Sequence, residues 1–297
     1  MTLLQVRHET VYRYGRAVAF GEHRMLLRPR DSMEQTLESF SLAIDPKPAS
    51  VRWLHDVFGN GIAIASFEQP AETLRIVASM VLDHTPELTP PFEIEKRAET
   101  YPFDYGDVDA IDLAPNLRRQ YPEESEVDAW ARRFLDPRGV TTTGHLLATM
   151  TLGIKESFRY LRRHDPGTQR PGETLAKRQG TCRDFALLMI EAARSLGLAA
   201  RFVTGYLYSP ARDTGQHRGG GATHAWCQIF LPGAGWVEFD PTNGIIGTRD
   251  LIRVGVARAP RQAIPISGTF VGRKEDYLGM EVDVLVERVV SPQDSMG

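Results

Sequence analysis

The chain has 297 residues, of which 42% are hydrophobic and 25% are charged, and its formal net charge is -3. These values are typical of a globular protein with one large domain or two ordinary ones. The charges are interspersed and give no basic footprint for nucleic acid, and no apolar run is long enough for a membrane-spanning helix.

The cellular compartment is predicted from the pattern of the first residues and from the number of cysteines. The first residues alternate like a β-strand and lack the regions of a signal peptide, so we expect a cytoplasmic protein. The chain has 2 cysteines, which argues against a disulfide framework and agrees with a reducing compartment.

Residues 1–85 are predicted to form an N-terminal β-sandwich domain, because several short alternating segments are separated by turn signals. The strongest of these signals is Gly59-Asn60-Gly61, which favours a hairpin. We interpret Asp56 and Asn60 as residues that shape this turn rather than as reactive groups. Repeated prolines in residues 86–122 indicate a linker between domains.

Residues 123–297 are predicted to form an α+β core with a C-terminal β tail. Helices are expected over 123–135 and 143–163, and a loop with one helical turn at most over 168–179. The tail is expected to complete a sheet. The sequence therefore predicts an α+β chain, in which an N-terminal β-sandwich precedes a helix bundle packed on an antiparallel sheet.

Cys182 opens the most informative helix of the chain. Thr181 suits the N-cap, and Asp184 completes a capping box three residues later. Apolar residues then recur at helical spacing until Gly197. Cys182 thus lies in the first turn, where unpaired N–H groups and the helix dipole favour a thiolate.

His224 and Asp240 are predicted to meet on two neighbouring strands. If the hairpin after Phe230 pairs that residue with Trp236, then Asp240 becomes a diagonal neighbour of His224 on the same face. A register slip of one residue would separate them. With Cys182, these residues would supply a nucleophile, a base and an orienting carboxylate, which is a papain-like arrangement.

The sequence resembles the bacterial transglutaminase-like proteins of the papain-like superfamily. The motifs that carry this resemblance are Phe158-Arg159-Tyr160, Gly180-Thr181-Cys182-Arg183-Asp184-Phe185-Ala186, Ala200-Arg201-Phe202-Val203-Thr204-Gly205-Tyr206, Thr223-His224-Ala225-Trp226 and Trp236-Val237-Glu238-Phe239-Asp240-Pro241-Thr242-Asn243. Further motifs, Tyr12-Arg13-Tyr14, Leu27-Arg28-Pro29-Arg30 and Asp56-Val57-Phe58-Gly59-Asn60, resemble the N-terminal β domain of that family. The tail is a weaker match, because Ala257-Arg258-Ala259-Pro260 stands where similar proteins often carry a Gly-Arg-Asp-Tyr-like segment.

The resemblance implies acyl transfer through a thioester, with Cys182, His224 and Asp240 as the catalytic triad. It implies a peptide or protein substrate and no cofactor or metal. Water as acceptor gives a protease or amidase and an amine gives cross-linking; we expect hydrolysis. Trp226, on the same face as His224, and Arg183, beside the nucleophile, are the candidate substrate contacts.

Several alternatives stay open. A metal site that uses Cys227 is disfavoured, because His224 and Cys227 face opposite sides of their strand. A disulfide between Cys182 and Cys227 is disfavoured in a reducing cytoplasm. Arylamine acetyltransferases use the same triad, but their chain organisation differs. A non-enzymatic binding scaffold is the competitor from another class. The glycine-rich loop 209–221 is a candidate lid, its His217 is interpreted as solvated, and the oligomeric state is left open.

Overall fold

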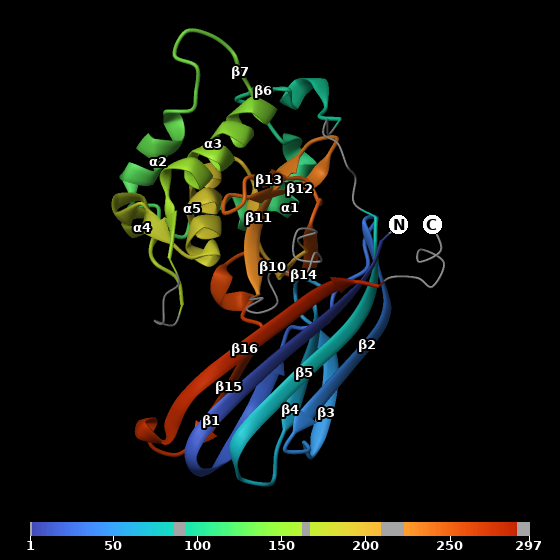
Figure 1. Ribbon diagram of the computed structural model, residues 1–297. Helices are drawn as coiled ribbons and strands as arrows, with labels where there is room; N and C mark the ends of the chain where they lie inside the picture. The colour runs from blue at the N-terminus through green and yellow to red at the C-terminus, as the bar shows by residue number, and fades with distance from the viewer. Residues whose placement is uncertain (1, 86–92, 162–166, 209–222, 290–297) are drawn as a thin grey trace.

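The computed structural model describes residues 2–85, 93–161, 167–208 and 223–289. An all-β domain lies against a mixed core of helices and strands (Figure 1). This arrangement confirms the α+β class. Within the described ranges, no helix is long and apolar enough to span a membrane.

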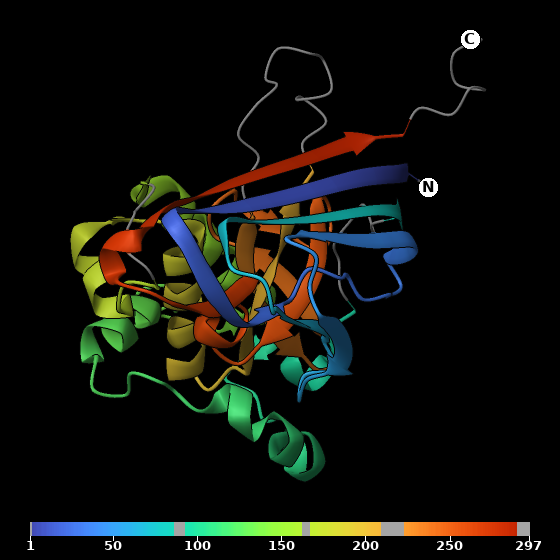
Figure 2. The same ribbon diagram turned by 90° about the horizontal axis from the view of Figure 1, so that it is seen from below.

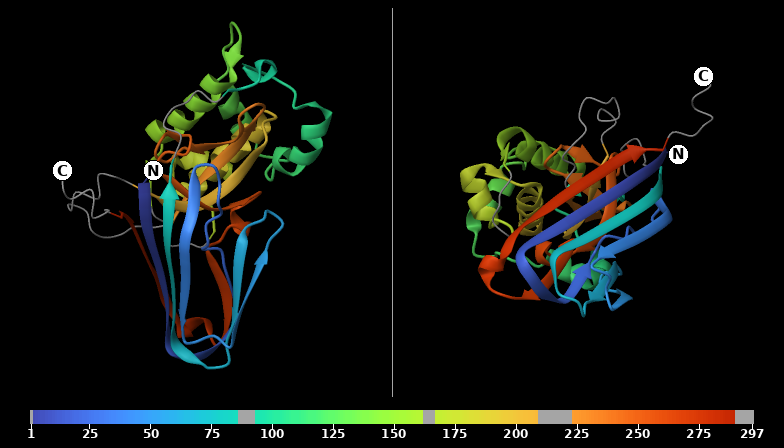
Figure 3. Two further views of the ribbon diagram at one scale, coloured as in Figure 1. Left: turned by 90° about the vertical axis from the view of Figure 1, so that its right-hand side faces the viewer. Right: turned by 60° about the horizontal axis from the view of Figure 1, so that its bottom comes forward.

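The N-terminal domain is organised around one long strand, β1 (Thr2–Met25). The first half of β1 pairs with β5 and β16, and its second half pairs with β4 and β15. The register shifts between Arg13 and Val18, where the strand passes from one layer to the other. Two layers that share β1 thus form the sandwich (Figure 3). The other strands are β2 (Gln35–Asp45), β3 (Ser50–His55), β4 (Gly61–Ser66), β5 (Ala71–His84), β15 (Ile266–Val271) and β16 (Tyr277–Arg288).

The predicted hairpin at Gly59-Asn60-Gly61 joins β3 to β4, with His55 opposite Gly61. The Asp56 carboxylate accepts the backbone N–H groups of Phe58 and Asn60, each at 2.9 Å. Gly59 has a φ of 74°, which a residue without a side chain adopts most easily. The turn-forming role of Asp56 is confirmed.

The C-terminal tail requires a correction to the predicted domains. Only β14 (Leu251–Ala257) completes the core sheet. The following strands return to the N-terminal domain, where Met25 faces Ile266 and Leu4 faces Arg288. Figure 2 shows β16 running beside β1 for most of its length. Both ends of the chain therefore build the sandwich, and the tail protects an edge of β1 that would otherwise expose unpaired backbone groups.

The core consists of helices packed on a five-stranded antiparallel sheet with the order β13-β12-β11-β10-β14. Its strands besides β14 are β10 (Ala200–Leu207), β11 (His224–Leu231), β12 (Gly235–Asp240) and β13 (Ile245–Ile246). Its helices are α1 (Gly106–Leu117), α2 (Ser125–Arg132), α3 (Thr143–Ser157), α4 (Pro171–Lys177) and α5 (Cys182–Ser195). Helix α5 is buried between the sheet and the other helices (Figure 1).

The predicted linker 86–122 is largely part of the core. It contains α1, and Pro115 is accommodated inside that helix. The Tyr105 hydroxyl donates to the Phe230 carbonyl at 3.0 Å and accepts the Ala199 N–H at 2.9 Å. These bonds hold the segment on the sheet, so the proline content alone was misleading. Of the prolines, those at 86, 90 and 91 lie outside the described residues.

Helix α3 ends at Ser157, earlier than predicted, and α4 is longer than the single turn expected. The reason is a short parallel pair, in which β8 (Arg159–Tyr160) bonds β9 (Gln179–Gly180). Elsewhere β6 (Thr100–Tyr101) pairs with β7 (Thr141–Thr142), and 3-10 turns span Lys96–Ala98, Pro260–Gln262 and Lys274–Asp276.

Two side-chain amides join the sandwich to the core sheet. Asn60 Nδ2 donates to the Val256 carbonyl at 2.7 Å, and Asn60 Oδ1 accepts the Val256 N–H at 3.0 Å. Gln35 makes the same two contacts with Arg253, at 2.8 and 3.0 Å. Both amides thus pair with backbone groups of β14 as a neighbouring strand would.

We expect Asn60→Ala to lower the free energy of unfolding by about 2–4 kcal/mol, because it leaves two buried backbone groups of Val256 without partners. Urea denaturation checks this value. Thr36→Ala, at an exposed position of β2, is the control and should change stability by about 0.5 kcal/mol or less. Equal free energies of unfolding for the two variants would contradict a stabilising role of the Asn60 hydrogen bonds to Val256.

Candidate active site

Cys182 is the first residue of α5, as predicted. The Thr181 side chain accepts the Asp184 N–H, and the Asp184 carboxylate accepts the Thr181 N–H at 2.8 Å. This capping box fixes where the helix begins. The thiol is therefore held in the first turn, beside unpaired N–H groups at the positive end of the helix dipole.

The loop before the nucleophile is fixed by the same carboxylate. Asp184 Oδ1 accepts the Gln169 N–H at 2.7 Å, and Gln169 Nε2 donates to the Gln179 carbonyl at 2.9 Å. A Cβ on Gly180 would lie 2.9 Å from the Asp184 Cβ, so this close approach requires glycine. Cys182 thus follows a tightly constrained loop.

The two strands that carry His224 and Asp240 have the predicted register. Phe230 faces Trp236 and Cys227 faces Phe239. The His224 Nε2 and the Asp240 Oδ2 are 2.8 Å apart. The geometric prediction, which depended on this pairing, is confirmed.

The His224 imidazole also contacts the Cys182 thiol. Burial by itself lowers the pKa of His224, but the charge and hydrogen bond of Asp240, together with the Cys182 contact, raise that pKa to about 10. Because Asp240 engages Nε2, Nδ1 is the nitrogen left for the sulfur. The three side chains therefore form one chain of contacts, from thiol to imidazole to carboxylate.

Asn243 is a member of this cluster that the sequence analysis did not assign. Its Nδ2 donates to Asp240 Oδ2 at 2.7 Å and lies 3.2 Å from His224 Nε2. Asp240 Oδ1 accepts the Thr242 N–H at 2.9 Å. Burial by itself raises the pKa of Asp240, yet His224 and these donors lower it. The Asp-Pro-Thr-Asn turn after β12 was the available signal, because an aspartate commonly accepts N–H groups two residues on.

Trp226 lies behind His224 rather than in front of it. Its ring is stacked with the imidazole at a centroid distance of 5.8 Å, and its Nε1 donates to Glu238 Oε2 at 2.5 Å. The residue is 0% exposed, so its side chain presents no open surface to a substrate in this structure. Trp226 instead limits how the imidazole can turn.

Glu238 holds the Trp226 indole in place, and the sequence analysis did not assign it a role. Its carboxylate accepts hydrogen bonds from Gln228 Nε2 at 2.7 Å and Arg253 Nη1 at 2.8 Å, besides the indole N–H. Burial raises the pKa of Glu238, while Arg253 and the hydrogen bonds oppose that rise. A glutamate facing Gln228 on a buried strand was the only hint in the sequence.

Arg183 is engaged in structural contacts. Its Nη2 donates to the Pro260 carbonyl at 2.7 Å, and its guanidinium lies 4.9 Å from the centre of the Phe202 ring. These contacts occupy the guanidinium, and the substrate contact of Arg183 stays a prediction. The arginine connects the start of α5 to the segment after β14.

Cys227 faces away from the cluster, as predicted. It is fully buried, and its thiol donates to the Phe239 carbonyl at 3.3 Å. Both cysteines are free. In the described ranges, no group of three or more His, Cys, Asp and Glu side chains is placed to hold a metal ion. The candidate lid 209–221, with His217, lies outside the described residues.

Comparisons with known proteins agree with this architecture. The family described as "Bacterial transglutaminase-like N-terminal region" matches residues 4–83, and the "Transglutaminase-like superfamily" matches residues 129–241. The chain is therefore similar to transglutaminase-like proteins in two separate regions, one in the N-terminal domain and one in the core.

Two mycobacterial relatives, each described only as an uncharacterized protein, match along nearly all of this chain. One from Mycobacterium tuberculosis is 29% identical over 310 residues, covering 98% of this chain and 94% of its own length. One from Mycobacterium leprae is 27% identical and covers 97% of this chain and 98% of its own length. The crystal structure of a "putative cysteine protease" from Cytophaga hutchinsonii matches with a TM-score of 0.73 at 18% identity, over 98% of this chain and 91% of that chain. This likeness shows the shared fold.

Proposed function

We propose that the protein is a cysteine hydrolase that cleaves amide bonds of peptide or protein substrates through a thioester. The observation that carries this proposal is the chain of contacts from Cys182 through His224 to Asp240, at the start of a buried helix. A thiolate and an imidazolium in contact supply both the nucleophile and the acid that amide cleavage needs.

The first half-reaction forms the acyl-enzyme. The Cys182 sulfur attacks the amide carbonyl carbon, and the carbonyl oxygen becomes an oxyanion. The backbone N–H of Cys182 has no acceptor among the described residues, so it is free to stabilise that oxyanion. His224 gives its proton to the departing amine as the C–N bond breaks, which leaves a thioester.

In the second half-reaction, His224 takes a proton from water, and the resulting hydroxide attacks the thioester carbonyl. The acid product leaves and the sulfur recovers its negative charge. Asp240 holds the ring through Nε2 in both steps, and Asn243 and Thr242 hold Asp240. Trp226 limits ring rotation from behind.

The low exposure of the nucleophile and its base favours a narrow, extended substrate segment. Cys182 is 7% exposed and His224 is 8% exposed. An extended peptide segment or a carboxamide side chain can reach such a sulfur, whereas the surface of a folded domain cannot. This exposure favours flexible segments as substrates.

The proposal is tested by incubating the wild type and Cys182→Ala with a mixed peptide library and a biotinylated alkylamine. Mass spectrometry should show new peptide termini or hydrolysed carboxamides with the wild type alone. Biotin on glutamine side chains would instead identify an amine as the acceptor. Products that appear equally with Cys182→Ala would contradict a cysteine mechanism.

A further inference from the structure

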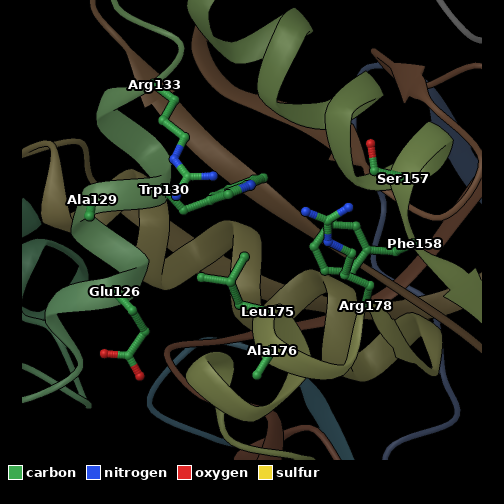
Figure 4. Close-up of a pocket in the computed structure, with 9 residues that line it drawn as sticks. All are labelled: Glu126, Ala129, Trp130, Arg133, Ser157, Phe158, Leu175, Ala176 and Arg178. Carbon is green, nitrogen blue, oxygen red and sulfur yellow. The ribbon is translucent and has the colours of Figure 1, made fainter.

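A cavity lies in the helical part of the core, between α2, α4 and the end of α3. Its volume is about 460 Å³, within the range of small-molecule sites. Figure 4 shows the side chains of Trp130, Phe158 and Leu175 around it, with Arg133 and Arg178 at its rim. None of its lining residues belongs to the Cys182 cluster.

The interior of this cavity is aromatic. The Trp130 and Phe158 rings meet edge to face, with centroids 6.4 Å apart and planes at 78°. Phe158 also packs on Phe185 of α5, at 5.9 Å. Both lining rings are largely buried and held by neighbours, so the part of each ring that lines the cavity is an apolar surface of fixed orientation.

Arg133 supplies one positive charge that no group among the described residues neutralises. The adjacent Arg132 is paired with Asp128 at 3.1 Å, as charged residues on a helix surface commonly are. In the described part of the chain, the Arg133 guanidinium has neither an ion pair nor a side-chain hydrogen bond. In Figure 4 it lies close to Trp130 and is directed toward the cavity.

Arg178 supplies a second such charge from an unusual backbone position. It is the C-cap of α4, with φ of 48° and ψ of 39°, a left-handed conformation that favours glycine. Its neighbour Lys177 is paired with Glu173 at 2.6 Å, whereas no described side chain pairs with Arg178. A residue with a side chain has a higher conformational free energy in this left-handed position. The guanidinium of Arg178 is directed toward the cavity, beside Phe158 (Figure 4).

Glu126 is the acidic residue of the lining, and it lies on another part of the rim. Figure 4 shows its carboxylate pointing away from the two guanidinium groups. It therefore leaves their charges available to a ligand. Two guanidinium groups beside a fixed aromatic surface match a carboxylate attached to an aromatic body.

We propose that this cavity binds an aromatic carboxylate, with the ring against Trp130 and Phe158 and the carboxylate between Arg133 and Arg178. Such a group occurs in a free aromatic acid and at the end of a peptide with an aromatic last residue. The proposal is independent of the function of Cys182.

The test is isothermal titration calorimetry of the full chain with N-acetyl-L-phenylalanine and with N-acetyl-L-phenylalaninamide, which lacks the charge. The acid should bind at least tenfold more tightly than the amide. Arg133→Gln should weaken binding of the acid at least tenfold, and Arg132→Gln, the matched control outside the cavity, should leave it unchanged.

Arg178→Gly separates binding from folding, because glycine suits the left-handed position and removes the charge. It should keep or raise the melting temperature and still weaken binding of the acid at least tenfold. Binding of acetyl-Ala-Ala-Phe distinguishes a free aromatic acid from the C-terminal end of a peptide as the natural ligand. Binding as tight as that of N-acetyl-L-phenylalanine points to a peptide end, and binding at least tenfold weaker points to a free acid.

Three results would overturn the proposal. They are no binding of the acid by the folded wild type at millimolar concentration, equal affinity for acid and amide, and unchanged affinity in both arginine variants. Each is readable without any activity measurement.

Discussion

His224→Ala, in a Cys227→Ser background, is expected to slow alkylation of Cys182 by iodoacetamide at pH 6 by about 50-fold. An ordinary thiol with a pKa of about 8.5 is only about 0.3% thiolate at that pH. In the wild type, the neighbouring imidazolium stabilises the anionic sulfur. His224→Ala removes this stabilisation, and because a stabilised thiolate is intrinsically less nucleophilic, the ratio of the two rates stays moderate.

The pH dependence of this reaction follows from the charges of His224, which contacts the sulfur, and of Asp240, which contacts His224. Because the pKa of His224 is raised to about 10, the ring stays positive through neutral pH and loses its proton as the pH rises through about 10. Because the pKa of Asp240 is lowered, its charge survives as the pH falls below the usual range of aspartate. We therefore expect labelling of the wild type to depend less steeply on pH than labelling of His224→Ala, because only the wild type keeps a positive ring beside the sulfur through neutral pH.

Mass spectrometry of the labelled protein at timed intervals measures both rates. His145→Ala, at an exposed position of α3, is the matched histidine control and should label like the wild type. Equal labelling of His224→Ala and the control at pH 6 would show that the thiol is not activated. A binding scaffold would then be the better reading of this fold.

Glu238→Ala is expected to lower the free energy of unfolding by about 3–5 kcal/mol. The substitution removes the acceptor of the Trp226 indole, the Gln228 amide and the Arg253 guanidinium together. The guanidinium is left mostly buried without its counter-charge, and buried donors without acceptors each cost further free energy. Loss of the anchor also frees the Trp226 ring that stacks on His224.

Glu238→Gln is the matched variant, because it keeps the side-chain volume and one acceptor oxygen while it removes the charge. It should cost about 1–3 kcal/mol, less than the alanine variant. Urea denaturation, followed by tryptophan fluorescence, gives both values. A loss of less than about 1 kcal/mol in Glu238→Ala would contradict the assigned role of this buried carboxylate.

Much of the candidate site was predictable, because its parts are set by neighbours in sequence. The capping box involves residues only three apart, so Thr181 and Asp184 place Cys182 without help from the rest of the fold. The short loop between β11 and β12 fixes how Phe230 meets Trp236, and this pairing places His224 near Asp240.

Other features depended on which strands meet far along the chain. The sequence predicted β15 and β16 as strands, but their pairing with β1 joins residues more than two hundred positions apart. Alternation of side chains shows that a strand has two faces and does not identify its partner. For this reason the tail was assigned to the wrong domain.

Burial explains the remaining corrections. The sequence placed Trp226 on the same face as His224, but only the packed core decides that Glu238 and Arg253 cover that face. The sequence by itself determined the α+β class, the helix that starts at Cys182 and the register of its two partner residues, because these rest on local hydrogen bonds and turn lengths. Only the tertiary structure decided the domain boundaries, the surroundings of Trp226 and the cavity with its two arginines, which have no ion pair among the described residues. These features rest on contacts between distant segments, which no local sequence pattern encodes.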